Sequence, residues 1–524
     1  MDPTEDAQPI RSAEPPRRAK RLLVNVLSGW LAVGVNLFIG FVLSPYMIRK
    51  LGADRYGIWA LVLAVADYLL LFDLGFKSAL INFSAKAHAL GDNDGVNRAI
   101  NTSLAIFSVT ASASIVVVLI LFTYAQRLFK LDPVYRGEFS TLVLITGIGW
   151  SVSLVVGVFR GGLESFSLFR VNNTIWMASS IVRATGWGLL LYFGYGPVQM
   201  AVTLVAAQLG AYAVAYPVFR RAFPALQLSR RFVSWQCAKD MAHFGFHTVV
   251  AGVSLMFLNQ GVPVLVGHFL PSRFVGFYSL PTRFLQVAMD SVSRVGAIMT
   301  PNATEMAARG ETAQIVRMGT FGNRYCYILT MPLTVFLCVY RWELIYVWVG
   351  QEFAVNSARL MPVMALSLSF GAAAQFCSSC ILYGIAKHQR FARSLTFESA
   401  FSVIGLFIIS PRYGIFGAAI WTSLLLVLNR GLYTPWLFCR NLDASYLTYM
   451  REIYLRPTAL AIPLWMLGSA IRTHWVAGRN WPELFFVLGL LAAVYYTAGF
   501  LLCAEPEHRG AAVSWISRRL GRKG

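Results

Sequence analysis

Eleven charged side chains lie inside long apolar stretches of the chain or at their edges, where a charge is costly. A charge at the centre of a membrane helix costs about 2.5–3.5 kcal/mol on the insertion scale, so it usually faces a partner or a water-filled cavity. The four cations that we expect to bind an anionic substrate are Lys77, Arg183, Arg283 and Arg294. The four carboxylates that we expect to hold a coupling ion are Asp67, Asp73, Asp290 and Glu398.

The depth of each cation in the membrane separates those that could bind a substrate from those that could reach the membrane surface. At about 1.5 Å per residue, Arg183 and Arg283 lie near the middle of their predicted helices and have no easy route to water. Lys77 lies near a helix end, so its long side chain can extend to the membrane surface instead of lining a cavity. We expect the same of three further arginines near helix ends, Arg324, Arg430 and Arg456.

Spacing suggests that some of these charges neutralise one another. Asp73 precedes Lys77 by four residues, and Asp290 precedes Arg294 by four, so each pair can share one helix face. Mutual neutralisation that helps the helix insert is an equal alternative to a functional role. Asp67 and Glu398 have no cation at such a spacing, and lone intramembrane carboxylates are candidate proton or cation sites. Four uncharged polar residues are expected to form hydrogen bonds between helices: His247, Asn259, Gln260 and Gln375.

Composition places these charges in an all-α, polytopic integral membrane protein. Apolar residues make up 57% of the 524 and charged residues only 13%, against about 25% in soluble domains. The net charge of +21 is explained by basic loops that orient membrane helices, so no nucleic acid partner is expected. Cys377 and Cys380 form a C-x-x-C within an apolar segment and are interpreted as packing residues. No metal, cofactor or catalytic residue is predicted, and no P-loop is present.

About fourteen spans are predicted, each long enough to cross a bilayer. Their approximate ranges are 22–48, 56–83, 99–123, 139–159, 171–193, 197–219, 242–267, 274–302, 319–340, 354–385, 394–410, 413–437, 453–471 and 483–503. The tenth is longer than a bilayer requires, so it is tilted, kinked or extended. Lys and Arg number about 26 in one set of connections and about 11 in the other. This asymmetry predicts that both termini are cytoplasmic.

A basic segment divides the chain into two similar parts. Leu51–Leu61 (LGADRYGIWAL) follows the first span, and Leu270–Leu280 (LPSRFVGFYSL) follows the seventh. Two lobes of six helices each would be related by an axis along the membrane normal, because an even number of spans returns the chain to its starting side. The predicted parts are a cytoplasmic tail (1–21), an N-lobe (22–219), a basic cytoplasmic linker (220–241), a C-lobe (242–437), two C-terminal helices (438–503) and a basic cytoplasmic tail (504–524). Within that tail, Ala511 to Lys523 suits an interfacial helix or an orienting basic segment.

The stretch from Leu51 to Leu61, followed by Asp73-Leu-Gly75, resembles the polysaccharide biosynthesis (O-antigen and exopolysaccharide lipid-carrier) flippases. These belong to the multidrug/oligosaccharidyl-lipid/polysaccharide exporter superfamily. The resemblance implies alternating access in the bacterial inner membrane. Its implied substrate is an undecaprenyl-diphosphate-linked oligosaccharide, turned from the cytoplasmic to the periplasmic leaflet. Membrane lipids and other polysaccharide-assembly membrane proteins are further candidate partners. The candidate residues above come from depth, because the family has no fixed lumen motif.

Two other functions remain open. A multidrug exporter would use buried carboxylates for a cationic drug, and the loss of drug transport on Asp67→Asn would favour it. A membrane glycosyltransferase or polymerase would present a large outer loop with catalytic acids, but the longest predicted outer loop, 124–138, is short. We therefore expect a transporter rather than an enzyme. If it is a flippase for an anionic lipid, Arg183→Ala and Arg283→Ala are predicted to abolish export while the protein still inserts.

Overall fold

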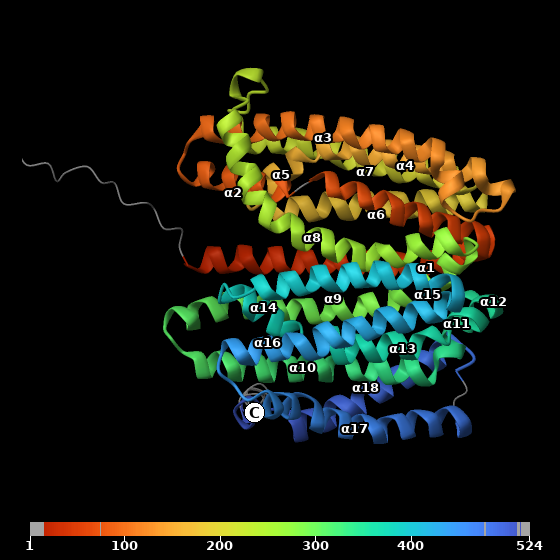
Figure 1. Ribbon diagram of the computed structural model, residues 1–524. Coiled ribbons are helices and arrows are strands. Elements are labelled where there is room, and N and C mark those ends of the chain that lie inside the picture. The colour runs from red at the N-terminus through yellow and green to blue at the C-terminus, as the bar shows by residue number, and fades with distance from the viewer. Residues whose placement is uncertain (1–14, 74, 476–477, 511–513, 515–524) are drawn as a thin grey trace, which may run out of the picture. The chain divides into compact units, whose positions relative to one another are not determined.

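The computed structural model describes residues 15–73, 75–475, 478–510 and 514, and all regular elements in this part are helices (Figure 1). The helices before the basic linker are α1 (Pro15–Tyr68), α2 (Phe76–Ala89), α3 (Asn93–Leu128), α4 (Arg136–Val156), α5 (Val158–Ser165), α6 (Phe169–Tyr192) and α7 (Pro197–Ala222). Those after it are α8 (Trp235–Phe269), α9 (Arg273–Ala308), α10 (Thr312–Val339), α11 (Arg341–Val349), α12 (Gln351–Ser357), α13 (Leu360–Ser367), α14 (Phe376–Gly384), α15 (Gln389–Leu426), α16 (Thr434–Asn441), α17 (Tyr446–His474) and α18 (Trp481–Cys503). The expected tail helix from Ala511 to Lys523 and most of the N-terminal tail lie outside the described residues.

The membrane character of the fold is confirmed. Within the described residues, eight helical stretches are long and apolar enough to cross a bilayer, or nine if α10 and α11, bent by 78°, form one broken span. Two of the eight have 40 and 53 residues (Gly34–Asp73 and Gln389–Asn441), whereas about 20 suffice for one pass. Each contains a glycine with positive φ, Gly52 (φ 77°) or Gly414 (φ 60°), that divides it into two helices. The predicted number of fourteen spans stays a prediction.

The second predicted span, 56–83, is not one continuous helix. The α-helix ends at Tyr68, a 3-10 turn follows over Leu69–Asp73, and α2 begins at Phe76. Gly75 has φ 72°, which a residue with a Cβ adopts only at a cost. The side chain of Asp73 accepts a hydrogen bond from the backbone N–H of Lys77 at 3.0 Å, so it satisfies a donor in the first turn of α2. A hydropathy pattern does not reveal such a break, because both pieces are apolar.

The tenth predicted span, 354–385, is also interrupted, which agrees with the expected kink. The chain runs through α12 and α13, a π-helical turn over Leu368–Ala373, and then α14. A second π-helical turn, Val427–Tyr433, joins α15 to α16 and lies next to the first. Gly371 and Gly431 allow this approach, since a Cβ on Gly431 would lie 3.3 Å from the Cα of Gly371. Such turns occur often at functional sites.

The chain divides into two compact units. Unit 1 comprises residues 1–44, 72–118 and 145–246, and unit 2 comprises 45–71, 119–144 and 247–524. In unit 1, α2, α5 and α7 surround a core that includes Leu80, Leu163 and Phe219, with α6 packed on α7 (Figure 1). In unit 2, α9 and α14 pack against α10, and α17 and α18 cover α10 (Figure 1). The units do not follow the ranges expected for the two lobes, so those boundaries stay a prediction.

The basic linker after α7 is held against α3 by side-chain amides. The amide nitrogen of Asn97 donates to the Ala225 carbonyl at 3.0 Å, and its amide oxygen accepts from the backbone N–H of Gln227 at 2.9 Å. Asn101, one turn further along α3, makes the equivalent pair of bonds with Gln227 and Ser229. Both asparagines are buried, and their bonds pair backbone groups that would otherwise lack a hydrogen-bond partner, which would cost free energy.

The two similar sequence motifs are in contact within unit 2. Gly57, in the part of α1 after the kink, lies against Gly276 of α9, where a Cβ would be 3.5 Å from the Cα of Gly57. A Cβ on Gly57 would collide with the backbone carbonyl of Ser272. Glycine at both positions therefore lets the two helices approach closely. The internal repeat itself stays a prediction.

Candidate functional site

Two cations and one carboxylate meet in unit 1, where α2 contacts α5. Glu164 Oε1 lies 3.0 Å from the Arg160 Nε and 3.7 Å from the Lys77 Nζ. The Glu164 side chain is only 15% exposed, whereas those of Arg160 and Lys77 are 29% and 38% exposed. Two cations thus share one partly buried carboxylate, and each has more N–H donors than its contact with Glu164 uses.

Small residues in α5 determine where this cluster lies. A Cβ on Gly161 would lie 2.8 Å from the Leu80 side chain of α2, and one on Gly162 would lie 2.7 Å from the ring of Phe219 in α7. Glycines at these positions let α5 pack closely between α2 and α7. The flanking residues Arg160 and Glu164, one turn apart, then project from the same face.

One face of α6 completes the site with aromatic rings and a third cation. The guanidinium of Arg160 lies 4.3 Å from the ring centre of Trp176, and that ring packs edge-on against Tyr212 of α7. Two turns further along α6, the half-buried Arg183 lies 5.3 Å from the ring of Trp187. Cation–π contacts of this kind orient a guanidinium without neutralising its charge.

The polar face of α6 begins at Asn172, which is buried. Its amide nitrogen donates to Glu164 Oε1 at 3.1 Å and so holds the carboxylate that the two cations share. The predicted pair of Asp73 and Lys77 therefore has two different partners. Asp73 binds the backbone of α2, and the Lys77 ammonium faces Glu164.

A second set of predicted residues meets in unit 2. The Gln260 Nε2 donates to Asp67 Oδ2 at 2.8 Å, and Arg283 acts on Asp67 through its charge. Gln260 thus forms the interhelical hydrogen bond expected of it, and Asp67 is not the lone carboxylate that its own helix suggested. The spacing rule failed here because these partners come from α8 and α9, about 200 residues away in sequence.

The remaining predicted residues of α9 lie further along the same helix. Asp290 Oδ1 accepts a hydrogen bond from Gln286 Nε2 at 2.9 Å, one turn back. Arg294 is half-buried, and Arg283 is exposed. Roles in substrate or ion binding stay predictions for all three.

Glu398, predicted to be unpaired, is buried in an ion pair. Its Oε2 lies 3.3 Å from the Arg430 Nε and accepts a hydrogen bond from the Asn429 Nδ2 at 2.7 Å. Both partners belong to the π-helical turn that follows α15. Arg430 was predicted to extend to the membrane surface. Its guanidinium instead neutralises Glu398, because the π-helical turn places Arg430 next to this carboxylate.

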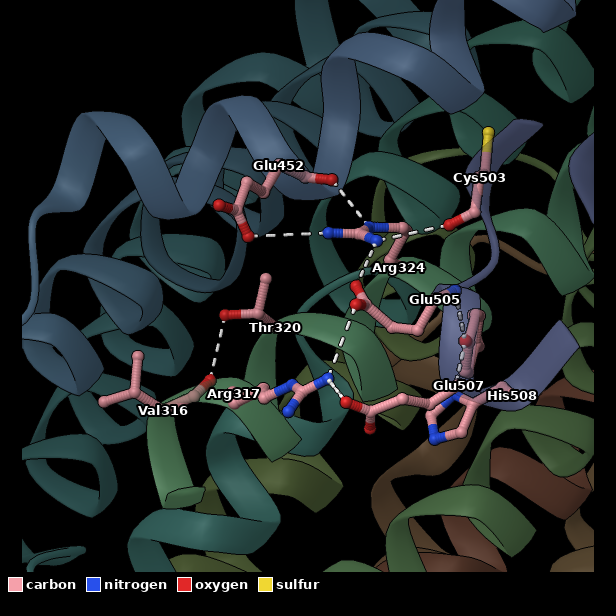
Figure 2. Close-up of polar contacts among 10 residues, drawn as sticks. Val316, Arg317, Thr320, Arg324, Glu452, Cys503, Glu505, Glu507 and His508 are labelled. Carbon is pink, nitrogen blue, oxygen red and sulfur yellow. Dashed lines mark hydrogen bonds and ion pairs between the residues drawn. The ribbon is translucent and has the colours of Figure 1, made fainter. Parts of the chain in front are cut away.

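Arg324 is another cation whose predicted escape to the surface is wrong. Its side chain is 7% exposed, and its Nε donates to the Glu452 carbonyl at 2.8 Å (Figure 2). Its Nη1 reaches Glu505 Oε1 at 2.8 Å and the Cys503 carbonyl at 3.2 Å. This guanidinium joins α10 to α17 and to the segment after α18.

Sequence reasoning missed the centre of the unit 1 site. Arg160 and Glu164 were overlooked because the predicted fourth span ended at residue 159, which left both in an assumed loop. Trp176 lies inside the predicted fifth span, where an aromatic residue is not distinctive. The four-residue spacing of an arginine and a glutamate around two glycines was the available signal. In the described part of the chain, no cluster of three or more His, Cys, Asp or Glu side chains could hold a metal ion.

Comparison with known proteins identifies relatives over nearly the whole chain. The sequence matches the model of the family described as polysaccharide biosynthesis protein over residues 22–299, which is more than half of the chain. It is 18% identical to the uncharacterized membrane protein EpsK of Bacillus subtilis (strain 168), covering 93% of this chain and 97% of that protein. It is 19% identical to a putative O-antigen transporter of Shigella flexneri, covering 75% and 92%.

Solved structures share the fold at low sequence identity. The lipid II flippase MurJ in an inward closed conformation has a TM-score of 0.70 at 12% identity, covering 91% of this chain and 99% of that chain. An inward-facing multidrug resistance transporter of the MATE family has a TM-score of 0.64 at 13% identity, covering 78% and 95%. Lipid flippases and drug exporters thus share this architecture, so the fold alone does not choose between them.

Proposed function

Because this chain belongs to the polysaccharide biosynthesis protein family, we propose that it turns an undecaprenyl-diphosphate-linked oligosaccharide from the cytoplasmic to the periplasmic leaflet. The observation that carries the proposal is the cluster of Lys77, Arg160 and Glu164 beside Trp176. A diphosphate carries about two negative charges and can form charge-assisted, bidentate contacts with a guanidinium.

The geometry of the cluster suits reversible binding. Both cations are held by a single carboxylate, so an incoming phosphate can replace Glu164 as a partner without leaving a cation unpaired. Arg183 carries a positive charge further along the same face of α6. The aromatic rings of Trp176 and Tyr212 offer flat surfaces against which a sugar can stack.

The direction of transport has a physical source. With the termini in the cytoplasm, as the basic loops indicate, outward movement of an anion follows the inside-negative potential and gains about 2.3 kcal/mol per charge per 100 mV. This holds only if the protein's cations stay in place while the substrate passes. If they move with it, a coupling ion at Asp67, Asp73, Asp290 or Glu398 must supply the bias.

A drug exporter would need a different kind of binding site in this chain. It requires a carboxylate that is available to a proton or a cationic drug. Glu398 is paired with Arg430, whereas Asp67 accepts a hydrogen bond from the neutral Gln260 and so remains a candidate for either role. Resistance to cationic drugs that depends on Asp67 and not on Arg160 would favour the exporter.

The deciding experiment is complementation of a flippase-deficient bacterial strain. The expected result is restored surface polysaccharide and the loss of lipid-linked repeat units from the inner leaflet. A radiolabelled lipid-linked sugar incubated with purified protein should remain chemically unchanged, which separates a flippase from a glycosyltransferase. Continued accumulation of the lipid-linked units despite normal expression would overturn the proposal.

A further inference from the structure

A basic pocket lies in unit 2 where α10, α17 and the segment after α18 meet. Its volume is about 930 Å³, at the upper end of the roughly 300–1,000 Å³ typical of ligand sites. The arginines that line it are Arg317, Arg324, Arg451, Arg456 and Arg509. The acidic residues that line it are Glu452 and Glu505, so the formal net charge of the lining is +3. None of these residues belongs to the proposed glycan site in unit 1.

The carboxylates of the pocket are already occupied. Glu505 lies 2.8 Å from Arg324 and 3.8 Å from Arg317, and Glu452 lies 3.5 Å from Arg324 (Figure 2). Arg451 and Arg456, on α17, have no hydrogen-bond or ion-pair partner among the residues that the structure describes. Two guanidinium groups of the pocket therefore remain available to an anion.

The walls of the pocket are held in place before any ligand arrives. Arg324 joins α10 to α17 through Glu452 and to the segment after α18 through Glu505 (Figure 2). The Tyr325 hydroxyl accepts a hydrogen bond from the backbone N–H of Glu505 at 3.2 Å and lies 2.7 Å from the His508 Nδ1. Preorganised walls reduce the ordering that binding would otherwise require.

Apolar side chains border the same pocket. Leu447 and Leu455 of α17 and Leu502 of α18 line it, and these side chains are 78%, 55% and 59% exposed. A free inorganic anion gains nothing from this apolar border. An anion attached to acyl chains can place its head among the arginines and its chains along the leucines.

We propose that this pocket binds the phosphate-bearing headgroup of an anionic membrane lipid, through Arg451 and Arg456. The orientation predicted from the loop charges places these helix ends at the inner surface, where basic pockets between helices can hold such headgroups. The headgroup can come from a bulk phospholipid or from a lipid diphosphate, which share this chemistry. The proposal does not depend on glycan transport.

The test uses full-length protein in detergent and measures the rise in Tm caused by added lipid. Phosphatidylglycerol should raise the Tm, whereas zwitterionic phosphatidylcholine and free inorganic diphosphate should not. In the R451Q/R456Q variant, phosphatidylglycerol should bind about 30-fold more weakly, which corresponds to about 1 kcal/mol for each arginine. The matched control is R220Q/R221Q, which removes two adjacent exposed arginines at the end of α7.

Competition identifies the source of the headgroup. If undecaprenyl diphosphate displaces phosphatidylglycerol from wild type but not from R451Q/R456Q, the pocket accepts either lipid. If it does not compete, the pocket serves bulk phospholipid alone. Equal phosphatidylglycerol binding by wild type and R451Q/R456Q would overturn the proposal, as would equal weakening in R220Q/R221Q. A failed complementation with normal lipid binding would refute the proposed transport function and leave this site intact.

Discussion

Arg160 in unit 1 and Arg324 in unit 2 illustrate two different uses of a guanidinium inside a membrane protein. Arg324 is 7% exposed, and its donors are directed at two carboxylates and two backbone carbonyls. Arg160 is 29% exposed, shares one carboxylate with Lys77 and lies over an aromatic ring. A guanidinium with most of its donors engaged stabilises the fold, whereas one with donors to spare can bind a ligand.

The largest expected effect comes from removing Arg324. Arg324→Ala leaves Glu505 without its buried partner and removes two hydrogen bonds between α10 and α17. Breaking a buried pair typically costs about 3–5 kcal/mol, so we expect poor expression and a much lower Tm in detergent. Arg317→Ala, at the exposed rim of the same cluster, is the control and should leave the Tm unchanged. If the Arg324→Ala variant is stable and folded, Arg324 does not stabilise the fold and the contrast with Arg160 is wrong.

Arg183 extends the comparison, because its guanidinium lies over the ring of Trp187 and has no ion-pair partner in the described part of the chain. We expect Arg183→Ala to abolish glycan export while the protein inserts and keeps its Tm. Arg283→Ala should do the same, since Arg283 is exposed on α9. Surface polysaccharide and membrane levels of the protein are the two measurements. Normal polysaccharide in both variants would remove these residues from the site.

Arg160 tests the shared carboxylate directly. A charge-assisted hydrogen bond contributes about 1.5–3 kcal/mol, so Arg160→Ala should reduce the export rate at least about tenfold. The Tm should change little, because Glu164 keeps Lys77 and Asn172 as partners. Arg170→Ala, an exposed arginine one and a half turns before Trp176, is the matched control. An unfolded Arg160→Ala protein would place Arg160 in the same class as Arg324.

The smallest expected effect concerns the aromatic partner. Trp176→Leu removes the ring beneath Arg160 and keeps an apolar side chain. A cation–π contact contributes about 0.5–2 kcal/mol, which predicts a 2- to 30-fold loss of export. Trp176→Phe should recover part of the rate because it restores an aromatic face. No recovery with Phe would show that the ring supports packing rather than the orientation of Arg160.

Sequence patterns were informative where each helix could be treated alone. Apolar runs predicted an all-α membrane protein, and the motif around Gly57 pointed to the right family. The same patterns failed where partners come from distant segments. Glu398 and Asp67 were predicted to be lone carboxylates because only neighbours on the same helix were considered. Glu398 has Arg430 across a π-helical turn, and Asp67 has Gln260 on another helix.

The amino-acid sequence by itself determined that this chain lies in a membrane and that a few charges are retained there at a cost. Hydropathy and charge are local properties, summed over about 20 residues, and so they can be read without a fold. Only the tertiary structure decided which of those charges neutralise one another. Coulombic pairing depends on separations of a few ångströms between helices, and sequence distance does not report them. For that reason Arg324 and Arg160, two arginines near the ends of predicted spans, have different surroundings in the folded protein.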